Sequence, residues 1–176
     1  MNRAEKCELG LVVAYSLLLF HDSPWNVIPY GSKMLSFFYK SVDEPGYIRP
    51  FITTRFEQGN IQVGQPGSTV FYRNYNIMML GIILIEIFMQ AKIERFRTKK
   101  ECQEVTPKTE ANVNLNVAYR VAAKMDDAPH RAAIKAFLEM AWFPEGQKAF
   151  LEGFNVRKGL FMHVIEPLRR EQGFAS

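Results

Sequence analysis

One apolar stretch, residues 76–92, limits what this chain can fold into. Its sequence is NIMMLGIILIEIFMQAK, and only Gly81 and Glu86 interrupt the apolar run from Ile77 to Met89. A helix that is apolar on all faces must be buried on all faces, either in a protein core or in lipid. Spanning a bilayer takes about 20 apolar residues, which is more than this run offers. The stretch therefore predicts the central helix of a soluble domain and no transmembrane segment.

Before this stretch, the pattern predicts one more buried helix and a small hairpin. Residues 8–20 carry apolar side chains at helical spacing and on most other positions. Residues 34–40 and 47–55 are rich in aromatic and β-branched residues, with turn chemistry at 43–46 between them. These segments predict a β-hairpin between the two buried helices, followed by a loop. Asn74 is a plausible N-cap of the central helix.

After the central helix, the chain predicts an exposed connection over residues 93–112 and then a group of helices. Pro129 marks the first turn of one of them, and residues 143–146 mark its end. Pro167 should kink or end the last helix. The residues expected on one face of the helix after the connection are Leu115, Ala118, Tyr119, Ala122 and Met125. The fold class is therefore mainly α, with residues 1–176 forming a single domain.

The start of the chain and its cysteines favour the cytoplasm. The opening sequence, MNRAEKCELG, has no usable signal-peptide cleavage pattern. Cys7 and Cys102 form neither a CxxC pair nor a metal-ligand spacing, so they predict two free thiols.

The positive charge of the chain is concentrated just after the central helix. The net charge is +4, and the five cations of this stretch minus Glu94 already equal it. The rest of the chain is balanced, so the composition does not favour a nucleic-acid-binding domain. An acidic protein partner or an anionic lipid fits better, although a solvated loop has the same composition. The candidate interaction residues are Lys92, Arg95, Arg97, Lys99 and Lys100.

Familiar catalytic and metal-binding motifs are missing from the sequence. There is no HExxH, no EF-hand loop, no Walker-type GxxxxGK[ST] and no GxSxG. His21 and Asp22 are adjacent, so their side chains do not face each other on a regular element. Glu86 lies within the most buried helix, where it should be paired or hydrogen-bonded. We expect a structural ion pair with an arginine of a later helix, and we assign no catalytic, cofactor-binding or metal-binding residue.

Three segments of the chain, in this order, match a set of known motifs. Residues 18–25, LLFHDSPW, resemble L-x-L-H-x-T-P-W. Residues 74–86, NYNIMMLGIILIE, resemble N-P-x-L-F-A-L-G-I-L-L-L-E, with Tyr75 in place of the proline. Residues 164–168, VIEPL, resemble V-V-x-P-L. Together these segments resemble a degenerate, kinase-like domain of unknown function from filamentous fungi, which occurs with prion-inhibition (HeLo-type) modules. Residues 76–86 also resemble the pattern D-x-x-S-L-G-x-x-L-x-E of a protein-kinase C-lobe.

The resemblance implies a C-lobe fold without kinase activity. No Asp stands where the H-R-D loop would place it, between Trp25 and Leu35. The position of the D-F-G motif falls near Arg49, and Asn76 replaces the Asp at the helix start. No N-lobe lysine or Gly-rich loop is present, and phosphoryl transfer depends on such groups. Because the chain starts where a C-lobe starts, the resemblance also implies a fragment of a longer protein.

These observations predict a non-catalytic, kinase-like interaction or regulatory module. The resemblance implies a role in fungal self-recognition or cell-death signalling, with a protein as partner. Two alternatives stay open: an enzyme of unrecognised chemistry or nucleotide-binding remnant, and a peripheral membrane module that uses residues 92–100.

Overall fold

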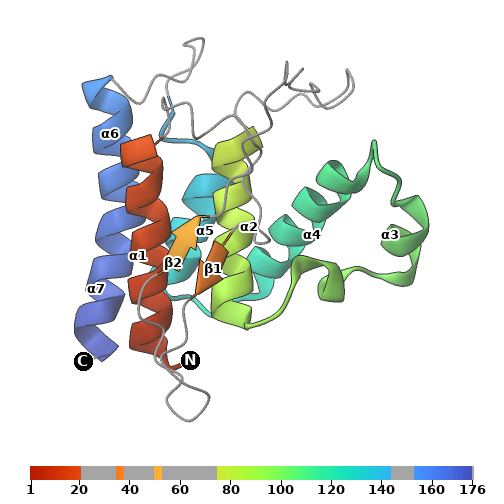
Figure 1. Cartoon of the computed structure of the whole chain (residues 1–176), viewed down its shortest axis with the longest axis horizontal. Helices are drawn as coiled ribbons and strands as arrows, with labels where there is room; N and C mark the ends of the chain where they lie inside the picture. The colour runs from red at the N-terminus through yellow and green to blue at the C-terminus, as the bar shows by residue number, and fades with distance from the viewer. Residues whose placement is uncertain (21–34, 38–49, 53–74, 144–152, 176) are drawn as a thin grey trace.

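The apolar stretch forms helix α2 (Tyr75–Met89), and other helices pack on both sides of it (Figure 1). The structure, a computed structural model, describes residues 1–20, 35–37, 50–52, 75–143 and 153–175. From Ile77 to Phe88, only Met79 and Glu86 are not fully buried, so the predicted central helix is confirmed. It ends earlier than residue 92, because Gln90 adopts the left-handed conformation with φ of 51°. Asn74 lies outside the described residues.

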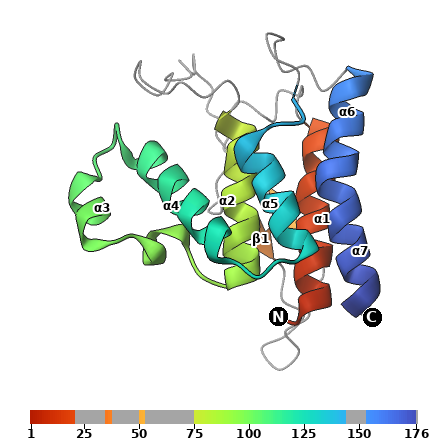
Figure 2. The same ribbon diagram turned by 180° about the vertical axis from the view of Figure 1, so that it is seen from behind.

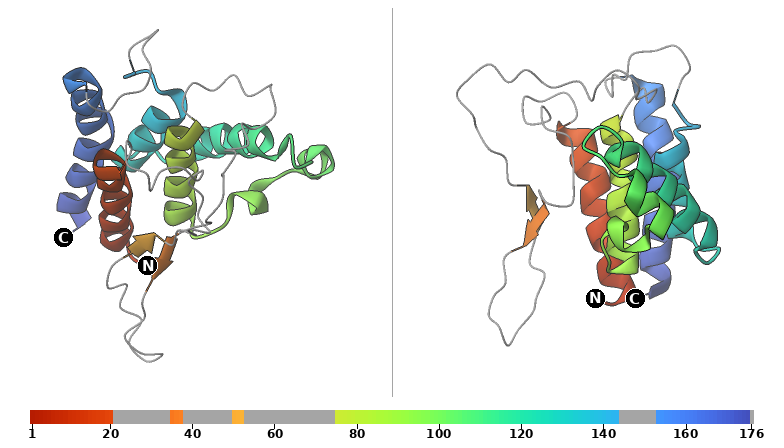
Figure 3. Two further views of the ribbon diagram at one scale, coloured as in Figure 1. Left: turned by 45° about the horizontal axis from the view of Figure 1, so that its top comes forward. Right: turned by 90° about the vertical axis from the view of Figure 1, so that its right-hand side faces the viewer.

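Helix α1 (Arg3–Phe20) packs against α2 on one side and against the C-terminal helix on the other. It begins at Arg3 rather than at Glu8, because the polar residues before the predicted apolar segment are helical too. Its buried side chains include Cys7, Leu11 and Val13, whereas Val12 is 40% exposed. Helix α1 is therefore less completely buried than α2. The first turn of α1 and the last turn of the C-terminal helix lie at the same end of the helices (Figures 1 and 3).

Helix α5 (Pro129–Glu139) lies against α2 and is seen best from behind (Figure 2). The helices can approach closely at Gly81, where an added Cβ would lie 2.9 Å from Cδ2 of Leu138. Pro129 stands in the first turn, as predicted. The helix ends before the predicted stop at residues 143–146, because Met140 takes a left-handed conformation with φ of 50°.

The C-terminal helical group is one continuous helix in three segments. These are α6 (Phe154–Leu160), the π-helical segment η4 (Phe161–Ile165) and α7 (Glu166–Ala175). The sequence predicts that Pro167 kinks or ends this helix, but the helix does not end there, because α7 continues through Pro167 to Ala175. Proline lacks an N–H, and its ring clashes with the carbonyl four residues earlier. The π turn just before it, where Glu166 N–H donates to Phe161 O, changes the local spacing and lets the helix continue.

The connection after α2 is more ordered than predicted. It contains a 3-10 helix, η3 (Ile93–Phe96), and a short helix, α3 (Lys99–Glu104), within the segment predicted to be an exposed connection. Thr98 and Glu101 form a reciprocal capping box at the start of α3. Helix α4 (Glu110–Lys124) follows and packs on α2 and α5. Its predicted inner face is largely confirmed, although Tyr119 is 37% exposed and donates its hydroxyl to Leu138 O at 2.6 Å.

Two short strands, β1 (Leu35–Phe37) and β2 (Pro50–Ile52), pair in antiparallel register with Ser36 opposite Phe51. Figure 3 shows the pair to one side of the helices. The strands fall within the two segments predicted to be extended, but the predicted turn at residues 43–46 lies outside the described residues. The mainly helical class and the single compact domain are confirmed. No helix within the described ranges is long and apolar enough to cross a membrane.

Candidate functional site

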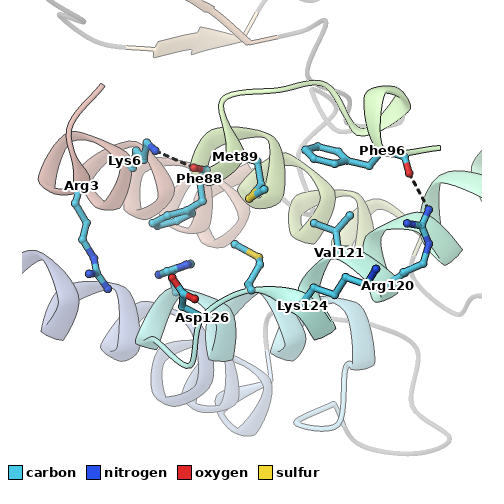
Figure 4. Close-up of a pocket in the computed structure, with 11 residues that line it drawn as sticks. Arg3, Lys6, Phe88, Met89, Phe96, Arg120, Val121, Lys124 and Asp126 are labelled. Carbon is cyan, nitrogen blue, oxygen red and sulfur yellow. Dashed lines mark hydrogen bonds between the residues drawn. The ribbon is translucent and has the colours of Figure 1, made fainter. Parts of the chain in front are cut away.

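A cleft of about 570 Å³ opens where the C-terminal ends of α2 and α4 approach the first turns of α1 (Figure 4). Helix α2 and η3 form one wall, and the end of α4 with the α4–α5 connection forms the other. These elements meet there because α4 and α1 both pack on α2. The sequence positions that line the cleft are therefore widely separated.

The middle of the cleft is apolar and contains two methionines. Met89 at the end of α2 is 42% exposed, and Met125 is partly buried. Phe88 and Phe96 lie on either side of Met89 in Figure 4. Methionine side chains are flexible and polarisable, so such a surface can adapt to differently shaped apolar groups.

Cations line both ends of the cleft. Arg3 and Lys6 lie at the Phe88 end, whereas Arg120 lies at the Phe96 end with Lys124 beside it (Figure 4). Asp126 is the one carboxylate among the described residues that line the cleft. The cleft therefore carries more positive than negative side chains.

Hydrogen bonds hold two of these cations in place and leave donors unused. Lys6 Nζ donates to Phe88 O at 2.8 Å, at the carbonyl end of α2. Arg120 Nη2 donates to Phe96 O at 2.8 Å and to Glu101 Oε2 at 2.7 Å. Since an ammonium has three donors and a guanidinium has five, both can still bind a ligand. Lys124 is exposed and has no hydrogen bond or ion pair within the described part of the chain.

Behind one end of the cleft, Glu171 of α7 joins three helices. Its carboxylate accepts hydrogen bonds from Arg3 Nε in α1 and from the His130 backbone N–H in α5, the latter at 2.6 Å. His130 Nδ1 lies 2.8 Å from Oε1, and the His130 ring stacks on Phe88 with centroids 4.2 Å apart. The N-cap residue of α5, Ala128, offers no side-chain cap, so Glu171 caps this helix from another helix.

The environment of Glu171 affects two titratable groups. Burial, the largest influence, raises the pKa of Glu171, but the hydrogen bonds from Arg3 and His130 outweigh it and leave the pKa below its ordinary value. Burial, reinforced by the Glu171 charge, raises the pKa of the Cys7 thiol to about 11. Cys7 is therefore a protonated, structural thiol at neutral pH, whereas Cys102 is exposed.

A family described as "Domain of unknown function (DUF7580)" matches residues 1–173. The chain belongs to this family. No curated protein and no solved structure matches the chain.

The structure separates the five candidate interaction residues of the DUF7580 domain. Arg95, Lys99 and Lys100 are exposed, and Lys100 Nζ lies 3.8 Å from Glu104 of the same helix. Lys92 Nζ lies 3.8 Å from Glu86 Oε2. Arg97 instead points inward, with a side chain only 10% exposed. None of the five lines the cleft, so they do not form one binding surface together with it.

Arg97 has a structural role that its charge in sequence does not reveal. Its Nε and Nη2 donate to Asn114 Oδ1 at 3.0 and 2.6 Å, and Nη2 also donates to Glu110 at 3.0 Å. Arg97 thereby fastens the segment between η3 and α3 to α4. Arg97 therefore differs from Arg95, Lys99 and Lys100, which are exposed.

We expect Arg97→Ser to lower the free energy of unfolding by about 1 kcal/mol, because it leaves the buried Asn114 side chain without its donors. Arg95→Ser is the matched control, since Arg95 is exposed and surface changes usually stay within about 0.5 kcal/mol. Urea denaturation of both variants measures the difference. Equal midpoints would show that the Arg97 contacts contribute nothing.

Glu86 is held locally and not by a later helix. Its Oε1 accepts a hydrogen bond from the Ile93 backbone N–H at 2.9 Å, and Lys92 lies near Oε2. The sequence predicts an ion pair between Glu86 and an arginine of a later helix. The charged partner in the structure is instead Lys92, which follows α2 directly. Glu86 instead satisfies a backbone donor at the start of η3, where the chain leaves α2.

Sequence reasoning missed Glu171, Arg3 and the cleft. His130 and Glu171 are 41 residues apart, and no motif connects them. One local signal for such a contact was available: α5 starts at Pro129, and Ala128 before it has no side chain that can cap the helix. The N–H groups of such a helix end need an acceptor from elsewhere in the chain.

His163 is exposed, and His21 and Asp22 lie outside the described residues. Across the residues that the structure describes, no group of three His, Cys, Asp or Glu side chains could hold a metal ion.

Proposed function

We propose that the DUF7580 domain is a non-catalytic interaction or regulatory module that binds an acidic protein partner at the cleft. The observation that carries this proposal is the placement of Lys6 and Lys124 around the apolar middle, with no carboxylate partner for either among the described residues. Arg3 and Arg120 are already offset by Glu171 and Glu101. The two lysines are thus the positive charge that a ligand could still neutralise.

The surroundings of the cleft favour binding over chemistry. His130 is held by Glu171 on one side and stacks on Phe88 on the other. Glu171 is 2% exposed and accepts donors from two helices, so it is committed to packing and cannot reach a ligand. Glu171 and His130 are thus engaged in holding α1, α5 and α7 together.

The resemblance in sequence supplies the finer part of the proposal. The segment that carries the kinase-like pattern, residues 74–86, includes most of α2, and residues 164–168 carry its closing segment. On this basis we propose a kinase-like, cytoplasmic module with a role in fungal self-recognition or cell-death signalling. The departures at the H-R-D and D-F-G positions support the absence of phosphoryl transfer.

Two measurements test the proposed function. Purified protein should transfer no phosphate from ATP in the presence of magnesium, and its melting temperature should not change with ATP. Affinity purification from its own cells should recover a partner that is lost with Lys124→Glu and kept with Lys108→Glu. Lys108 is the matched control because it is an exposed lysine outside the cleft.

The opposite results would replace the proposal with one of the alternatives. Magnesium-dependent phosphate transfer that a point change abolishes would indicate an enzyme. A shift in melting temperature with ATP would indicate a nucleotide-binding remnant. A partner that binds equally to wild-type protein and to the Lys124→Glu variant would exclude the cleft as its site.

A further inference from the structure

We propose that the cleft binds an acidic segment of the partner in which a large apolar side chain stands between acidic ones. This inference rests on the proposed function and specifies the chemistry of the segment that enters the cleft. Three features of the cleft carry it: the positions of the lysines, the exposed apolar middle and the carboxylate of Asp126.

The lysines are placed for two separate acidic groups. Lys6 lies beside Phe88 at one end, and Lys124 extends towards Arg120 at the other (Figure 4). The hydrogen bond from Lys6 Nζ to Phe88 O fixes the first ammonium, so a ligand need not order it. Arg120 adds further donors at the second end, because its hydrogen bonds to Phe96 O and Glu101 use only Nη2. A segment that carries acidic groups at separate positions can place one of them at each end.

The middle of the cleft requires an apolar group of the ligand. Met89 is 42% exposed, although it belongs to the most buried helix of the domain. It lies between Phe88 and Phe96, and Met125 and Val121 complete the apolar lining. A ligand that carries only acidic groups would offer these apolar side chains no apolar surface to pack against. An apolar side chain on Met89 would remove its exposed surface from water.

Asp126 limits the charge that the cleft can accept. It is exposed and lies in Figure 4 between Arg3 and Lys124. Since Glu171 and Glu101 already offset two of the four cations, a dense polyanion would face repulsion from Asp126 with only two lysines to neutralise it. This balance favours a segment with a few carboxylates over a polyphosphate or a nucleic acid.

The experiment is selection from a library of random peptides displayed on phage, with the whole chain as bait. Enriched peptides are then synthesised with a fluorescent label and titrated against four proteins. These are the wild type, Lys124→Glu, the control Lys108→Glu, and Met89→Ser. Lys124 and Met89 are chosen because both are exposed and melting curves can verify that the variants fold. Vesicles of phosphatidylcholine with phosphatidylserine form a separate arm.

We expect enriched peptides to place an aromatic residue, leucine or methionine between acidic residues. Lys124→Glu should weaken their binding about tenfold, since it replaces an attraction by a repulsion, and Lys108→Glu should leave it unchanged. Met89→Ser should weaken binding of the same peptides. It should not weaken binding of control peptides in which the apolar residue is replaced by serine, because these peptides make no apolar contact with Met89. Binding should also weaken with added salt, because screening shortens the range of the charges.

Several outcomes would overturn the inference. These are enrichment of peptides without acidic residues, no enrichment at all, and peptides that bind equally to the wild type and Lys124→Glu. Lys124-dependent binding to vesicles in place of peptides would assign the cleft to a lipid surface. The proposed function stands or fails separately, because a partner protein that depends on Lys124 would support it even when no short peptide binds.

Discussion

Replacing Leu80 with Ala should lower the free energy of unfolding by about 2–5 kcal/mol. Leu80 is 1% exposed and lies in α2, which packs against α1, α4 and α5. The change removes apolar contacts and leaves a cavity that helices on several sides cannot all close. Ile83→Ala, at a position that is 2% exposed, should have an effect in the same range. Urea or thermal denaturation followed by circular dichroism measures both.

Met89→Ala is the matched control for these core changes. It is a large-to-small change in the same helix, but Met89 is 42% exposed, so we expect a change within about 0.5 kcal/mol. A denaturation midpoint of Leu80→Ala equal to that of the wild type would mean that α2 is not the centre of the core. An effect of Met89→Ala as large as that of Leu80→Ala would mean that burial does not distinguish the two positions.

The sequence pattern predicts a helix well when its signal is local, such as an apolar run that is buried throughout or a proline in the first turn. Helix α2 is buried on nearly all faces, and its apolar run therefore predicts both its existence and its place. Pro129 predicts the start of α5 because proline has its φ fixed near the helical value and needs no hydrogen-bond partner for nitrogen in the first turn. Such features depend only on residues that are near one another in the chain.

Features that depend on distant residues could not be predicted. Arg97 in a polar, basic stretch has the composition of a solvated loop, and only the position of α4 turns it inward towards Asn114. Pro167 predicts a helix end, but the π turn of η4 before it absorbs the missing hydrogen bond. Both cases are tertiary effects on residues with strong local preferences.

The cleft has a similar origin. Lys6 and Lys124 belong to α1 and α4, and each reads as an ordinary solvated lysine in its own helix. The approach of both helices to the end of α2 brings their charges around Met89. The basic stretch after α2 was the obvious candidate by composition, and charge density along the chain did not indicate where cations gather in space.

Glu171→Gln should lower the free energy of unfolding by about 2–3 kcal/mol at neutral pH. The carboxylate is 2% exposed and accepts from Arg3 and from the backbone and side chain of His130. An amide nitrogen would face these donors with another donor, and His130 is largely buried and cannot turn to water. Arg3 is 58% exposed and can rehydrate, which keeps the loss below that for a fully buried pair. Glu166→Gln is the control, because Glu166 pairs with the exposed Arg170 on the same helix.

The effect of Glu171→Gln should also depend on pH, in a direction that the pKa of Glu171 determines. Its pKa in the folded protein lies below the ordinary value of 4.5, so the folded state binds the proton less tightly than the unfolded state. The stability that Glu171 contributes is therefore complete above about pH 5 and is lost as the pH falls through the folded pKa. The difference in stability between the wild type and Glu171→Gln should shrink as the pH is lowered from 5 to about 3. Because both proteins share all other carboxylates, this difference isolates Glu171. A difference that stays constant or grows over this interval would contradict the role of the ionised carboxylate as the acceptor that joins α1, α5 and α7.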